Sequence, residues 1–152
     1  MKSFPEAEAI TAIRCALDEY RTREWNTVQY LWEAIGEGLR WDEKAVESLS
    51  GEEECLVVFD PNEWNLAERI KFAALVQLEG SIIAFQCTRE KLKTMFSRAS
   101  FGEADFYVLD AHGKFLGLRS HEDEASLTGM WVPLPKSRPN QPVQRTGASA
   151  RR

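Results

Sequence analysis

The sequence contains few of the residues on which catalysis and metal binding usually depend. Its 152 residues include only two histidines and three cysteines, and Cys15, Cys55 and Cys87 form no close pair. A glycine-rich phosphate loop is also missing, because Gly36 and Gly38 lie too close together and follow a predicted helix rather than a strand. We therefore expect no catalytic residue, no metal site and no cofactor.

Long apolar segments are missing as well. No run of residues is apolar for long enough to cross a bilayer, and residues 1–6 lack the apolar core of a secretory signal. An odd number of cysteines without a close pair favours reduced, mostly buried thiols. These absences predict a cytoplasmic protein that does not bind membranes.

Basic residues are outnumbered by acidic ones, and they are distributed unevenly. Four of the 19 lysines and arginines, but none of the 24 acidic residues, lie in residues 137–152, so residues 1–136 carry a net charge of −9. An acidic body repels phosphate backbones and anionic lipids. We expect no nucleic-acid partner, and any charged partner should be a basic protein. The oligomeric state stays open.

Helical spacing of apolar residues dominates the first third of the chain. A capping box predicts that one helix starts at Ser3, and Asn26 is predicted to cap a second. Asp42 can start a short third helix that stops at Gly51. The apolar stripe of the first helix is Ile10, Ile13, Leu17 and Tyr20, and that of the second is Val28, Leu31, Trp32, Ile35 and Leu39.

The apolar pattern then becomes typical of strands. Residues 55–59 form a compact apolar run between acidic residues, which predicts a strand. Residues 61–79 fit two arrangements. We favour a helical turn at 61–67 followed by a hairpin of 69–78 and 81–87, in which one apolar face stays inward. A βαβ crossover is the alternative.

One more helix and a hairpin complete the predicted elements. Thr88 is predicted to cap a helix, and its apolar side carries Leu92, Met95 and Phe96. Residues 106–109 and 114–119 predict a β-hairpin whose turn contains Gly113, a residue free to adopt positive φ.

The pattern as a whole predicts an α+β fold. We expect N-terminal helices packed on a mainly antiparallel sheet of about five strands, with one further helix between the strand pairs. Residues 1–136 should form a single globular domain, in which Trp131, Val132 and Leu134 pack on the sheet. Residues 137–152 contain no large apolar residue except Val143, which predicts a disordered tail.

The candidate binding residues are tryptophans at element ends and two runs of acidic residues. Large aromatic side chains beside acids are typical of protein interfaces, although they also cap the edge of a core. Acidic runs likewise have two interpretations. They are either solvated residues that protect strand ends, or a contact surface for a basic partner. The candidates are Trp41, Trp64, Glu52, Glu53, Glu54, Glu122, Asp123 and Glu124.

A small enzyme or ligand-sensing domain is the alternative function. Layered α and β elements leave clefts between helices and sheet, and Cys87, His121 and Asp110 are the residues that such a cleft could use. Cys87 alternates with predicted core residues, however, which favours an inert buried thiol. His112, at the hairpin tip, and His121 are predicted to lie too far apart for one metal site.

Two segments resemble known sequences. Residues 138–149, Arg-Pro-Asn-Gln-Pro-Val-Gln-Arg-Thr-Gly-Ala-Ser, resemble a translated intergenic repeat at the C-termini of proteobacterial proteins, which implies a bacterial source. The pattern Leu56–Asp60, Ile82–Phe85, Leu92, Phe106–Asp110 and Leu116–Asp123 resembles small uncharacterised bacterial proteins with two strand pairs around one helix. Some of these resemble toxin-immunity proteins, which implies a non-enzymatic protein that binds another protein. The resemblance assigns no functional residue.

Overall fold

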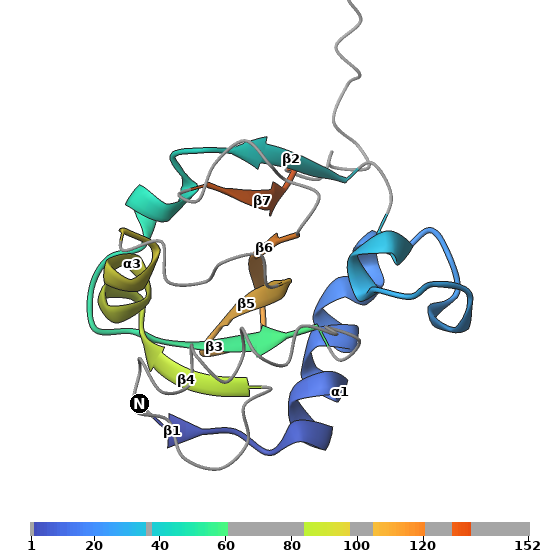
Figure 1. The fold of residues 1–152 in the computed structure, drawn as a ribbon, viewed down its shortest axis with the longest axis horizontal. Coiled ribbons are helices and arrows are strands. Elements are labelled where there is room, and N and C mark those ends of the chain that lie inside the picture. The colour runs from blue at the N-terminus through green and yellow to red at the C-terminus, as the bar shows by residue number, and fades with distance from the viewer. Residues whose placement is uncertain (1, 36–37, 61–83, 98–104, 121–128, 135–152) are drawn as a thin grey trace, which may run out of the picture.

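One antiparallel sheet with helices on both sides makes up the described structure (Figure 1). The computed structural model describes residues 2–35, 38–60, 84–97, 105–120 and 129–134. The predicted α+β class is confirmed. The strands are β1 (Lys2–Ser3), β2 (Leu39–Asp42), β3 (Glu54–Phe59), β4 (Ala84–Thr88), β5 (Phe106–Asp110), β6 (Phe115–Arg119) and β7 (Met130–Pro133), and the helices are α1 (Glu6–Leu17) and α3 (Arg89–Ser97).

The seven strands lie in the order β1-β4-β3-β5-β6-β7-β2, and all neighbouring pairs are antiparallel. Figure 1 shows this sequence of strands running from β1 at one end of the sheet to β2 at the other, with α1 and α3 on different sides. The prediction of about five strands was therefore slightly low. The additional strands are β1, β2 and β7, all of which are short and would be hard to recognise from alternation alone.

The register of the strands assigns side chains to two faces. Val57 pairs with Phe85 and Phe59 with Phe106, and the ring of Phe106 lies 5.6 Å from that of Phe96, so α3 covers this face. The opposite face carries Tyr107, and there α1 contacts β3, β5 and β6. The core therefore has two layers, because both faces of the central strands are buried. The largest fully buried side chains include Phe59, Phe85, Phe96, Phe106, Tyr107, Ile13, Leu17, Leu92 and Leu109.

Several predicted elements are confirmed. Ile13 and Leu17 are buried on α1, and Thr88 caps α3 by accepting a hydrogen bond from the Lys91 amide at 3.1 Å. The hairpin of β5 and β6 has a register shift between Val108 and Leu109, and its turn contains Gly113 with a φ of 81°. Residues 61–79, for which the sequence fits two arrangements, lie outside the described residues.

The helix predicted from Asn26 to Leu39 is wrong. Short 3-10 turns at Trp25–Thr27 (η2) and Leu31–Ala34 (η3) replace it, and Leu39 begins strand β2. The capping interaction lies four residues further on than predicted, because the Glu33 carboxylate accepts the amide hydrogens of Gln29 and Tyr30 at 3.1 and 2.7 Å. The predicted cap at Asn26 is therefore wrong, and the cap formed by Tyr30 and Glu33 starts a single turn.

The helix limits at the N-terminus also differ from the prediction. Ser3 belongs to β1, which pairs with β4, and α1 begins at Glu6 after Pro5. The short helix predicted to start at Asp42 is a 3-10 turn at Ala45–Ser48 (η4). Asp42 itself ends β2, and its carboxylate accepts the Lys44 amide hydrogen at 2.9 Å. A strand end and a helix start share this capping chemistry, which explains the difference.

Candidate functional site

A buried polar cluster joins η3 to the sheet. The Asp60 carboxylate accepts the Leu31 amide hydrogen at 2.8 Å and also the hydroxyl hydrogen of Tyr107. The Tyr107 oxygen in turn accepts the Trp32 amide hydrogen at 2.8 Å, and the indole nitrogen of Trp32 donates to Asp105 at 2.8 Å. These contacts satisfy the backbone groups of a turn too short to satisfy them itself.

The two carboxylates and the tyrosine of this cluster are completely buried, so its role is structural. Asp60, Asp105 and Tyr107 are all 0% exposed. Burial, and then the charge of Asp60, raise the pKa of Tyr107 well above its ordinary value, so the hydroxyl stays protonated and donates. Removing two carboxylates from water is costly unless they are hydrogen-bonded. The cluster therefore determines where η3 lies, and sequence analysis missed it because its acids stand at strand ends far apart in the chain.

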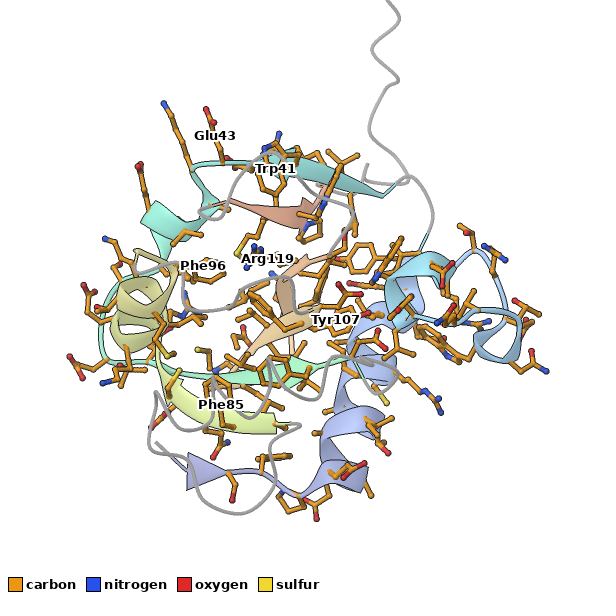
Figure 2. All side chains as sticks on the ribbon, viewed as in Figure 1. Trp41, Glu43, Phe85, Phe96, Tyr107 and Arg119 are labelled. Atoms are coloured by element: carbon orange, nitrogen blue, oxygen red, sulfur yellow. The ribbon has the colours of Figure 1, made fainter. Side chains whose placement is uncertain are left out.

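Trp41 forms an aromatic surface with Trp131 where β2 pairs with β7. The two residues are directly opposite each other, and their rings meet edge to face with centroids 5.8 Å apart. Leu39 and Pro133, the neighbouring pair on the same face, are half-buried, as are the two tryptophans. We call these four residues the tryptophan surface. Figure 2 shows Trp41 on β2 together with Glu43, which is exposed.

The absence of a side chain at Gly129 lets the Trp41 ring approach the backbone closely. A Cβ atom on Gly129 would lie 2.4 Å from the Trp41 ring and 2.8 Å from the Glu43 Cα atom. Real side chains do not approach so closely, so the Trp41 ring packs directly against the backbone that leads into β7. The candidate residue Trp41 is therefore partly exposed and closely packed against this backbone. Its partner Trp131, which was expected only to pack on the sheet, belongs to the same surface.

The acidic run Glu52–Glu54 lies where β3 begins and α3 starts. All three residues are exposed, and the Glu53 carboxylate lies 3.1 Å from the Arg89 guanidinium. Beside them Glu90 accepts the Gly51 amide hydrogen at 3.3 Å. Three strands, β5, β6 and β7, separate β3 from β2 in the sheet. The structure therefore does not bring this run together with Trp41.

The remaining candidates cannot be placed. Trp64, Glu122, Asp123 and Glu124 lie outside the described residues. His121, which belonged to the enzymatic alternative, lies outside them too. Among the residues that the structure describes, no three histidine, cysteine, aspartate or glutamate side chains gather in a group that could hold a metal ion.

Two thiols face each other across β3 and β4. Cys55 and Cys87 are directly opposite, both are buried, and their Sγ atoms lie 4.0 Å apart. The hydrogen bond between them raises the pKa of Cys87 and lowers that of Cys55, and burial also raises the pKa of Cys87. A raised pKa disfavours the nucleophilic thiolate.

Asp110, opposite Cys55, accepts the amide hydrogens of His112 and Lys114 within the hairpin turn.

Comparisons with known proteins do not assign a family. No protein-family model matches this chain, and neither a curated protein nor a solved structure is similar to it. Among the described helices, none is both long enough and apolar enough to cross a membrane.

Proposed function

We propose that this protein is a non-enzymatic, cytoplasmic binding protein that recognises a basic protein partner, in the manner of a toxin-immunity protein. The observation that carries the proposal is the tryptophan surface. Paired tryptophans that remain partly exposed on a sheet offer large contact area at little entropic cost, and tryptophan is among the residues enriched at binding hot spots. The partner would be recognised in part by charge.

Charge supports a basic partner. Residues 1–136 carry a net charge of −9, and Glu43 is exposed directly beyond β2. A negative protein attracts a positive one over several ångströms and accelerates their encounter. The exposed acids Glu52, Glu53 and Glu54 would add to this attraction at a distance from the tryptophan surface, although Glu53 is already paired with Arg89.

Binding should depend on Trp41. We expect Trp41→Ala to weaken binding of a basic partner by about 30-fold or more, the effect of losing a hot spot worth about 2 kcal/mol. Isothermal titration against a basic protein, with any basic nuclease toxin encoded beside this gene as the first choice, measures the change.

Trp25 provides the matched control. Its ring is also half-buried, but it lies in η2 with the Arg21 guanidinium 5.6 Å from the ring centroid, and it does not belong to the tryptophan surface. Trp25→Ala should leave the affinity within about twofold, because a tryptophan outside the contact contributes little. Equal losses for the two variants, with both folded by circular dichroism, would exclude the tryptophan surface. Absence of any binding by the unmodified protein would exclude the proposed function.

A further inference from the structure

Strand β2 is at the end of the sheet, and one of its edges has no neighbouring strand in the described structure (Figure 1). Such an edge presents backbone donors and acceptors in a row, which makes it a template for another strand. The pairing of β2 with β7 determines which groups this edge presents.

The outward-directed groups belong to Leu39 and Trp41. The Leu134 amide donates to the Gly38 carbonyl oxygen at 2.7 Å, and the register continues from there as Leu39 opposite Pro133 and Trp41 opposite Trp131. In an antiparallel pair, hydrogen-bonded and non-hydrogen-bonded positions alternate. Residues 38, 40 and 42 therefore direct their backbone groups toward β7, whereas Leu39 and Trp41 direct theirs to the free edge. No described residue forms a hydrogen bond with these outward groups.

The side chains on either side of Trp41 carry opposite charges. Arg40 and Asp42 lie on the face opposite the tryptophan surface, and the side chain of Arg40 is exposed. This order, positive before and negative after a central residue, is self-complementary when a strand meets an antiparallel copy of itself. A twofold axis at Trp41 places Arg40 of each copy opposite Asp42 of the other.

We propose that two copies of this chain pair antiparallel through the free edges of β2, around a twofold axis at Trp41. The two Trp41 residues exchange their backbone hydrogen bonds. On one face two Arg40–Asp42 pairs form between the copies. On the other face the two tryptophan surfaces become continuous, so the dimer presents a row of four indole rings.

Other registers fit less well. Within β2, residues 39 and 41 offer the outward backbone groups, so each of them must lie opposite an odd-numbered residue of the second copy. The axis at Trp41 meets this condition with Trp41 opposite Trp41 and with Leu39 opposite Glu43, just beyond the strand. An axis at Arg40 meets this condition but brings the two Arg40 side chains together, and like charges directly opposite are unfavourable. An axis at Asp42 has the same defect with the two Asp42 carboxylates. The axis at Trp41 converts both repulsions into attractions.

The dimer should be weak and dependent on concentration. An edge of four residues buries much less than the ~800 Å² per partner of a typical stable interface, so we expect a dissociation constant on the order of 100 µM. Sedimentation equilibrium from about 10 µM to about 1 mM covers the transition. A protein that stays monomeric over this whole range would overturn the proposal.

Charge reversal tests the register. In Arg40→Asp two acids oppose each other on both sides of the axis, and in Asp42→Arg two arginines do, so each variant alone should dimerise at least ~10-fold more weakly. An equimolar mixture of the two should recover the dimer, because each Arg40–Asp42 position again holds opposite charges. A folding defect in either variant could not explain recovery of the dimer on mixing. A dimer of unchanged affinity in Arg40→Asp would place the interface elsewhere.

A second variant guards against a folding defect. Asp42 accepts the Lys44 amide hydrogen, so Asp42→Arg removes a turn contact as well as a charge. Asp42→Asn keeps an oxygen that can accept this hydrogen bond but loses the ion pair, and it should weaken the dimer by a smaller factor than Arg40→Asp. A variant Asp42→Asn as strongly dimeric as the unmodified chain would contradict the pairing.

The dimer does not rest on the proposed function. Sedimentation uses the purified chain alone, and Arg40 lies on the face opposite the tryptophan surface. Arg40→Asp should therefore weaken self-association while each monomer retains its tryptophan surface. Failure to dimerise leaves the partner-binding experiment unaffected, and failure to bind a partner leaves the dimer unaffected.

Discussion

A chain shortened by removal of residues 131–152 should lose most of its stability. Strand β7 lies between β6 and β2, so its loss leaves β2 without the neighbour to which it is hydrogen-bonded. It also removes Trp131, which packs against the core and against Trp41. Loss of a fully buried large aromatic costs about 3–5 kcal/mol. Trp131 is only half-buried, but a whole strand is removed with it, so we expect a loss of about 3 kcal/mol or more from the 5–15 kcal/mol that stabilises a typical domain. We expect the melting temperature to fall by about 10 °C or more.

A shorter deletion is the control for this experiment. Removal of residues 137–152 takes away four arginines and one large apolar residue, Val143. If the tail contributes nothing to the core, as its composition predicts, stability should change by less than about 0.5 kcal/mol. Differential scanning calorimetry of both chains measures this. A marked loss with the shorter deletion would move the predicted domain boundary beyond Lys136.

Substitution of Asp60 should also be strongly destabilising. Asp60→Ala leaves the amide of Leu31 and the hydroxyl of Tyr107 without their carboxylate acceptor in a fully buried place. A buried donor left unsatisfied costs about 1–3 kcal/mol, so the two together should cost about 3 kcal/mol or more. Urea unfolding followed by tryptophan fluorescence is a suitable measurement, because Trp32 contacts the same cluster.

Two further variants separate the hydrogen bonds from the loss of a charge. Asp60→Asn retains an oxygen that can accept, so it should lose less stability than Asp60→Ala. Asp18→Ala removes an exposed carboxylate whose ion pair with Arg21 spans 2.8 Å, and exposed pairs contribute about 1 kcal/mol at most. If Asp60→Ala proved no worse than Asp18→Ala, the cluster would not be what attaches η3 to the sheet.

The elements with strong local signals were predictable from the sequence. Helix α3 has a cap at Thr88 and buried residues at helical spacing, and the β5–β6 hairpin has a glycine where the backbone needs positive φ. Strand β3 is an unbroken apolar run between acids. In each case neighbours in the chain supply the determining interactions, so the pattern and the structure agree. The α+β class follows from these elements together.

Residues 26–42 show where local signals are insufficient. Their apolar residues have helical spacing, yet the backbone of η3 is hydrogen-bonded to Asp60 and Tyr107, which are 29 and 75 residues distant from their partners. Leu39–Asp42 is a strand because β7, about 90 positions further along the chain, lies beside it. No window of sequence contains both partners, and tertiary contacts override a weak helical preference.

The properties of the candidate site likewise depend partly on the sequence alone and partly on the tertiary structure. The sequence by itself determined the acidic charge, the scarcity of catalytic residue types and the order Arg40, Trp41, Asp42 along the chain. Only the tertiary structure placed Trp41 against Trp131 and Gly129, separated it from Glu52–Glu54 by three strands, and left the β2 edge with Arg40 and Asp42 on either side of the central residue. Composition and spacing are properties of one chain segment, whereas a surface is formed by strands whose order in the sheet is set by long-range packing and hydrogen bonding.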